Sequence, residues 1–154
     1  MKARASYVSN SSSSSFIVIP KDVQPSDIDY QKMAVAFAFD QDVNSWSGLF
    51  PFGCDEFGWQ TAKYFDLESK WNWLVIQAYY GGDEYKAIID DFLKSIDANL
   101  RVDWTMMASC GAYIDHQSVD PEGQFAEVGK IGIGEFLIND RCYVKNGNDN
   151  GDYE

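Results

Sequence analysis

Apolar side chains in the middle of the chain recur at the spacing of an α-helix. Five of them share one helical face: Leu67, Trp71, Leu74, Val75 and Ala78. The flanks of that face hold Trp73, Ile76 and Tyr80, which predicts burial on more than one side. Asp66 is a good N-cap residue, and Gly81 stands where a glycine commonly follows a helix end. The pattern predicts a helix between Asp66 and Gly81.

A second helix of the same kind follows the Gly81-Gly82 pair. Its apolar residues again fall on one face: Tyr85, Ile88, Ile89, Phe92, Leu93 and Ile96. Asp90 and Lys94 have the spacing of an i,i+4 ion pair, and Asn99 is suited to close the helix. Two helices joined by a glycine pair predict an αα-hairpin.

Shorter apolar runs predict the strands. They lie at residues 16–19, 33–39, 100–107, 111–117 and 141–145. Residues 129–140 remain open between a short helix, weakened by Gly132 and Gly134, and a strand with a turn. This order predicts an α+β fold, a mainly antiparallel sheet with a central αα-hairpin packed on one face. We expect a Ser-rich N-terminal arm (1–15), a single α+β domain (16–146) and an acidic tail (147–154).

Composition adds a strongly acidic charge to this picture. The 154 residues are 45% hydrophobic and 16% aromatic, which is ample for a packed core. Lys and Arg number 12 against 24 Asp and Glu, a net charge of −12. This balance argues against direct binding of duplex nucleic acid or of an anionic membrane surface. It favours cations, metal ions or a protein with a basic surface as partners, and the alternative is that the charge only keeps an aromatic-rich protein soluble.

The cysteines and the termini bear on compartment and cofactors. Cys54, Cys110 and Cys142 are widely separated and odd in number, a pattern typical of neither a disulfide framework nor a zinc site. No apolar run approaches the ~20 residues of a membrane span, and serines stand where a secretory signal would be hydrophobic. We expect a cytoplasmic protein with no cofactor and no metal ion.

The best local candidate for chemistry surrounds the single histidine. His116 lies between Asp115 and Ser118, with Asp120 two residues further on, and these four are the candidate catalytic residues. In a strand Asp115 and His116 point to opposite faces, so an orienting carboxylate must come from elsewhere. A structural interpretation is also open and is the one we favour, in which His116 is hydrogen-bonded at a strand end beside a turn formed by residues 120–123. One histidine and no nucleophile-elbow motif give no support to a catalytic triad.

Residues 40–65 combine turn formers with many aromatic side chains. One interpretation packs the rings into the core beneath the helices. In the other, Trp46 and Trp59 line a groove beside Asp55 and Glu56 that binds a basic or cationic group.

Two short motifs carry a family resemblance. The leader Ser9–Phe16 (SNSSSSSF), together with the Tyr113–Ser118 segment (YIDHQS) and the closing Asn146–Asn150 run, resembles an uncharacterised family of small phage, prophage and Firmicutes-type proteins. The resemblance implies an accessory protein that acts in the cytoplasm of a host cell. It brings no catalytic residues and no substrate.

Charge, motifs and resemblance together predict a binding protein. We expect a small acidic phage-type accessory protein that engages a basic-surfaced protein partner, such as a host nucleic-acid-binding or defence enzyme that it inhibits. The alternative is a small hydrolase or nucleotide-binding protein with its site around Asp115–Asp120.

Overall fold

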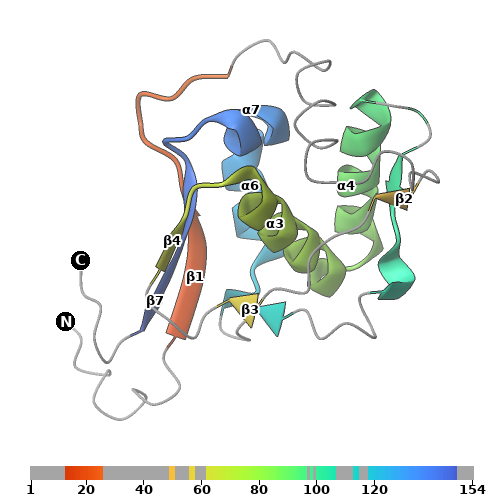
Figure 1. Cartoon of the computed structure of the whole chain (residues 1–154), viewed down its shortest axis with the longest axis horizontal. Helices are drawn as coiled ribbons and strands as arrows, with labels where there is room; N and C mark the ends of the chain where they lie inside the picture. The colour runs from red at the N-terminus through yellow and green to blue at the C-terminus, as the bar shows by residue number, and fades with distance from the viewer. Residues whose placement is uncertain are drawn as a thin grey trace.

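The computed structural model describes residues 13–25, 49–50, 56–57, 62–96, 98, 100–106, 113–114 and 118–148. Helix α3 (Leu67–Gly81) runs through the centre of the molecule (Figure 1). Asp66 caps it as predicted, because its carboxylate accepts a hydrogen bond of 2.9 Å from the Ser69 backbone N–H. Nine consecutive residues, Lys70 to Ala78, are buried. The helix is therefore covered on all sides, as its apolar flanks predicted.

Helix α4 (Asp83–Ile96) packs against α3 and confirms the predicted αα-hairpin. Gly81 is the last residue of α3 and Gly82, with a φ of 100°, ends the helix one residue later than predicted. The predicted ion pair between Asp90 and Lys94 does not form among the described residues. Asp90 instead accepts hydrogen bonds from the Val102 backbone N–H (3.1 Å) and the Trp104 indole N–H (3.0 Å).

A three-stranded antiparallel sheet covers one side of the helices, in the order β1-β7-β4. Its strands are β1 (Ser13–Val18), β7 (Tyr143–Asn148) and β4 (Ala62–Tyr64). The register places Ile17 opposite Val144, and Val144 opposite Tyr64. Ile17 and Val144 are buried and face the helices. The sheet confirms the α+β class.

Two predicted segment boundaries fall inside strands. β1 begins at Ser13, so three serines of the expected arm belong to the sheet, and β7 continues to Asn148, beyond the expected domain end at residue 146. The physical reason is the pairing itself, since Ser13 lies opposite Asn148 and Ser14 opposite Gly147. Each polar segment supplies the backbone partners that the other lacks.

The outer edge of β1 is also satisfied. The Ser15 backbone N–H donates to Ser118 Oγ at 2.7 Å, and the Ile17 backbone N–H donates to Gln124 Oε1 at 2.9 Å. Side chains from a distant part of the chain therefore cover an edge that would otherwise be open to pairing with another strand.

The remaining strands are short. β2 (Leu49–Phe50) pairs in parallel with β5 (Arg101–Val102), and β3 (Glu56–Phe57) pairs in parallel with β6 (Tyr113–Ile114). The strand predicted at 100–107 is thus only two residues long and gives way to a 3₁₀ turn, η3 (Trp104–Met106). The strand predicted at 33–39 lies outside the described residues.

Two helices complete the fold. α7 (Ile133–Ile138) settles the open interpretation of residues 129–140 in favour of a short helix, which begins after Gly132 with a φ of 92°. α6 (Pro121–Gly129) was not predicted, although Asp120 caps it and Pro121 occupies its first turn. That Asp-Pro pair is a helix-start signal. The expectation of a simple turn at 120–123 is corrected to the first turn of α6.

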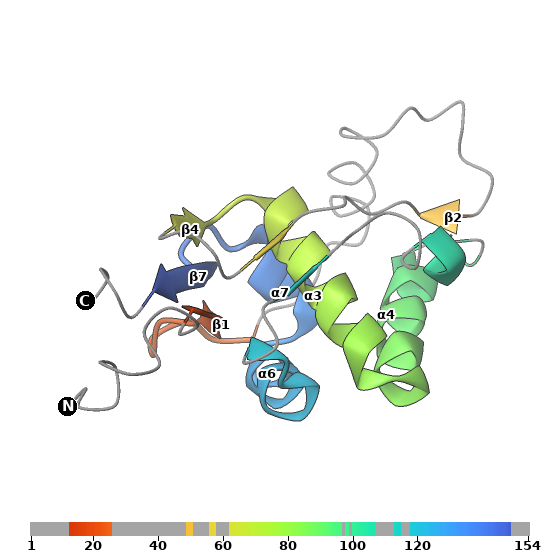
Figure 2. The same cartoon turned by 90° about the horizontal axis from the view of Figure 1, so that it is seen from below.

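The elements form layers, which Figures 1 and 2 show from two sides. The sheet lies on one side, α3 and α6 lie against its inner face, α7 packs on α3 and α6, and α4 lies beyond α3. The largest fully buried side chains include Trp71, Trp73, Phe57 and Phe136. The described helices all lie on one face of the sheet. The other face is covered by none of them.

Candidate functional site

A lysine with no solvent exposure, Lys70, lies near the start of α3. The Lys70 ammonium donates hydrogen bonds to three backbone carbonyls, those of Phe136 (2.8 Å), Asn139 (2.9 Å) and Cys142 (3.1 Å). All three of its N–H donors are used, and it lies 5.3 Å from the centroid of the Phe136 ring. Lys70 therefore ties α3 to the end of α7 and to the start of β7.

Burial changes the acid–base chemistry around this lysine. Removal from water lowers the pKa of Lys70 to about 8, against the opposing effects of Cys142, Asp66, Asp140 and Glu135. Burial also raises the pKa of the Cys142 thiol, which is free and fully buried. The site holds a proton that the solvent does not reach, and its geometry is that of a cross-link between elements.

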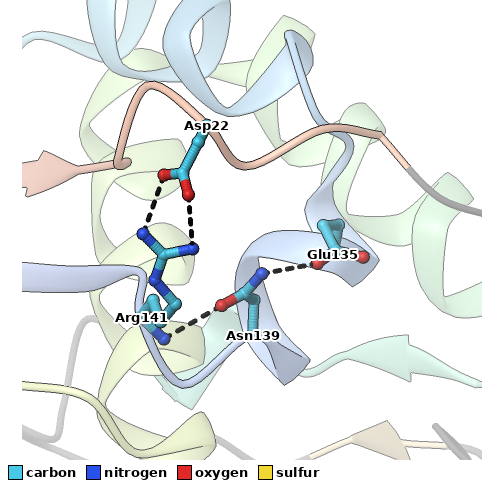
Figure 3. Close-up of polar contacts among 4 residues, drawn as sticks. All are labelled: Asp22, Glu135, Asn139 and Arg141. Atoms are coloured by element: carbon cyan, nitrogen blue, oxygen red, sulfur yellow. Dashed lines mark hydrogen bonds and ion pairs between the residues drawn. The ribbon is translucent and has the colours of Figure 1, made fainter.

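Asn139, whose backbone carbonyl accepts from Lys70, also belongs to a chain of side-chain contacts that reaches the surface (Figure 3). The Asn139 side chain accepts from the Arg141 backbone N–H (2.9 Å) and donates to Glu135 Oε2 (2.7 Å). The Arg141 guanidinium forms a bidentate pair with Asp22, with N–O distances of 3.0 and 2.7 Å. The side-chain hydrogen bond from Arg141 lowers the pKa of Asp22 and fixes the loop that follows β1.

A second buried network holds Ser118, one of the predicted site residues. Its Oγ accepts from the Ser15 backbone N–H, and its carbonyl accepts from the Gln77 side-chain amide at 2.8 Å. Gln77 Oε1 in turn accepts from the Asp120 backbone N–H at 3.1 Å. Trp73 Nε1 donates to Ser15 Oγ at 3.1 Å. Ser118 is buried, and these bonds join α3, β1 and the start of α6.

Sequence reasoning missed both networks, and one signal pointed to them. Lys70 and Gln77 share the apolar face of α3 with Leu74, at i−4 and i+3 from it. Polar side chains at core positions require hydrogen-bond partners elsewhere in the fold. Lys70 and Gln77, the polar residues on the apolar face of α3, are thus the residues whose side chains hold other elements against this helix.

Asp120 lies at an acidic surface formed by two helix starts. Its carboxylate accepts from the Gly123 backbone N–H at 3.1 Å and caps α6. The turn between α3 and α4 lies directly against this point, because a β-carbon on Gly81 would be 2.8 Å from Pro121 and 2.7 Å from Tyr85. The rings of Tyr85 and Phe125 are 5.4 Å apart, so α4 and α6 also meet here.

We call this surface the acidic helix face and define it as Tyr85 with Asp83, Glu84, Asp120 and Glu122. The four acids occupy the cap or first turn of α4 and α6, and all four are exposed. Burial, followed by the negative charges of Glu84, Glu122 and Asp120, raises the pKa of the Tyr85 hydroxyl. The Tyr85 hydroxyl is therefore under the influence of negative charges from both helix starts.

Most of the other predicted site residues lie outside the described part of the chain. They are the candidate catalytic residues Asp115 and His116 and the candidate binding residues Trp46, Asp55 and Trp59. Glu56 lies in β3, and the structure describes only its backbone. Within the described ranges, no group of three His, Cys, Asp or Glu side chains is placed to hold a metal ion.

A cavity of about 220 Å³ lies between the loop after β1 and the end of α6. It is lined by Ile19, Pro20, Lys21, Val23, Glu127, Lys130 and Ile131. Typical small-molecule sites measure about 300–1,000 Å³, so this hollow is smaller than most of them. Lys130 at its rim is paired with Glu127 at 3.0 Å.

Comparison with known proteins finds no matching family model, no matching curated protein and no matching solved structure. The resemblance to small phage and prophage proteins rests on its sequence motifs and stays a prediction. Among the described helices, none combines the length and the apolar character that a membrane crossing requires.

Proposed function

We propose that this protein binds a basic-surfaced protein partner through the acidic helix face. The observation that carries the proposal is the contact between the starts of α4 and α6. Tyr85 and Pro121 both lie beside Gly81, the Tyr85 and Phe125 rings are 5.4 Å apart, and the charges of Glu84, Glu122 and Asp120 act on the Tyr85 hydroxyl. A lysine or arginine of a partner would meet carboxylates and an aromatic ring together there. Such an arrangement adds cation–π attraction to charge complementarity.

The competing explanation assigns these acids to helix stability alone. Carboxylates in a first turn do interact favourably with the helix dipole. Only Asp120, however, caps a helix in this group, and Asp83 is fully exposed (103%), with one long ion pair of 3.9 Å to Lys86. The chain also carries twelve more acidic than basic residues, far beyond what two helix starts need. The surplus supports electrostatic steering toward a cationic surface.

The class of partner follows from the charge. A surface that binds nucleic acid carries clustered Lys and Arg, because it must neutralise phosphates. An acidic accessory protein in a host cytoplasm would compete for such a surface and inhibit a nucleic-acid-binding or defence enzyme. The phage and prophage resemblance implies an accessory protein in a host cytoplasm, and the inhibitory role is inferred from the charge.

Affinity capture tests the proposal with two charge-matched variants. Glu84→Gln/Glu122→Gln removes two charges from the acidic helix face, and Asp91→Asn/Asp140→Asn removes two exposed charges elsewhere. Immobilised wild type is expected to retain a basic protein from host lysate at about 0.15 M salt and to release it toward about 1 M, as the Debye length falls from about 8 to about 3 Å.

The first variant is expected to lose that partner and the second to keep it. A partner that both variants retain equally, or whose binding is indifferent to salt, contradicts an electrostatic role for this face.

A further inference from the structure

The side of the sheet away from the helices has an unusual composition. Residues paired across neighbouring strands share a face, and the register aligns Phe16 with Lys145 and Lys145 with Lys63. One step along, Val18 lies opposite Tyr143. We call the six residues Phe16, Val18, Lys63, Phe65, Tyr143 and Lys145 the outer sheet face. Their inward-pointing neighbours, such as Ile17 and Val144, are buried.

Aromatic rings on this face are exposed to solvent. Phe16 is 39% exposed and Phe65 is 43% exposed, high values for rings of this size. The ring of Phe65 lies 4.6 Å from that of Tyr143, at an interplanar angle of 36°. The rings of Phe16, Phe65 and Tyr143 therefore lie on the same face of the sheet.

The charge on the outer sheet face is opposite to that of the whole molecule. Its two charged residues are Lys63 and Lys145, and none of the six is acidic. Lys63 Nζ lies 5.7 Å from the centroid of the Tyr143 ring, so a cation sits beside the aromatic surface. In a chain with a net charge of −12, a positive aromatic face requires a separate explanation.

We propose that the outer sheet face binds single-stranded nucleic acid. Unpaired bases stack on exposed aromatic side chains of a sheet, and lysines placed among the rings neutralise the backbone phosphates. Phe16 and Phe65 are the stacking residues, and Lys63 is the phosphate contact. A duplex is not the expected ligand, because its bases are stacked inside the helix and cannot reach the rings.

The net negative charge of the protein limits affinity without preventing this binding. At about 0.15 M salt, charges more than about 8 Å away are largely screened, so distant acids act weakly on a strand lying on the sheet. They do remove long-range steering, and association is expected to be slow. The site is independent of the acidic helix face, which lies on α4 and α6.

Fluorescence anisotropy with labelled oligo-dT and oligo-U of about 12 nucleotides tests the proposal on the full chain. We expect binding by both oligonucleotides and weaker binding by a duplex of equal length. One phosphate contact, from Lys63, gives a salt slope near −0.7, so affinity is expected to fall about 2.5-fold from about 50 to about 200 mM salt.

Variants of the exposed residues locate the binding. Phe16→Ala and Phe65→Ala are each expected to weaken binding by about fivefold or more, and Lys63→Glu is expected to abolish it. The matched controls are Tyr80→Ala, an equally exposed ring (43%) on α3, and Lys94→Glu, an exposed lysine on α4. Both controls are expected to bind as wild type does. Thermal melts establish that every variant is folded, and Lys63→Glu remains informative if Phe16→Ala melts early.

Three results would overturn the proposal. The first is no anisotropy change with either oligonucleotide at about 50 mM salt, where phosphate contacts are strongest. The second is an equal loss in the control variants. The third is tighter binding of a polyglutamate peptide than of the oligonucleotides, with the same dependence on Phe16 and Lys63, which would assign the face to an acidic protein partner.

Discussion

Replacing Lys70 by methionine removes the buried ammonium and keeps an unbranched side chain of similar length. At neutral pH two effects oppose each other. The carbonyls of Phe136 and Cys142 lose their donor, at about 1–3 kcal/mol each, whereas the Asn139 carbonyl still accepts from the Cys142 N–H at 3.1 Å. The cost of burying the charge, about 3 kcal/mol for a pKa lowered from 10.5 to about 8, is also removed. The informative quantity is therefore the dependence on pH.

The sign of that dependence follows from proton linkage. Between pH 8 and 10.5 the unfolded chain keeps a proton on Lys70 that the folded chain has released. The free energy of unfolding of the wild type therefore rises with pH in this window, whereas Lys70→Met has no such contribution. The stability difference between the two proteins is expected to move by about 2 kcal/mol in favour of the wild type between about pH 7 and about pH 9.5.

Urea unfolding followed by tryptophan fluorescence measures this difference, since Trp71 and Trp73 are buried on the same helix. Equal m values in the two proteins establish that the comparison is between the same states. Lys94→Met, which changes an exposed lysine on α4, is the control. A difference that stays flat for Lys70→Met, or moves toward the variant as pH rises, would refute the assignment of a strongly buried ammonium.

Three further predictions test the packing and one buried hydrogen bond. Leu74→Ala removes a side chain with no solvent exposure and is expected to cost about 2–5 kcal/mol; a melt like that of the wild type would mean that the buried face of α3 is assigned wrongly. Gly81→Ala places a β-carbon within 2.8 Å of two side chains and is expected to cost about 1–3 kcal/mol, whereas Gly129→Ala, with no atom within 4 Å, is expected to be neutral or slightly stabilising; equal effects in denaturant titrations would contradict this contrast. Ser118→Ala leaves the Ser15 N–H without its acceptor and is expected to cost about 1–3 kcal/mol, so an unchanged urea midpoint would show that this bond is unimportant.

The sequence by itself determined the elements whose causes are local. The apolar face of α3, the Asp66 cap and the glycine pair all act within a few residues, and the αα-hairpin follows from them. Strand alternation similarly determined which side of β1 carries Ile17 and which carries Phe16, because the period of a strand is two residues. The α+β class required no more than the order of these patterns.

Tertiary structure decided what depends on partners far apart in the chain. Ser13–Ser15 and Asn146–Asn148 are poor strand formers, and they enter the sheet because each pairs with the other. The role of Lys70 rests on three carbonyls 66 to 72 residues away, which no local pattern can specify. The two proposed surfaces have the same origin, since the acidic helix face needs two helix starts in contact and the outer sheet face needs three strands in register. Local spacing determines which side of a helix or strand is apolar. Long-range packing determines which other element covers that side, because the free energy of burial outweighs the weak conformational preferences of single residues.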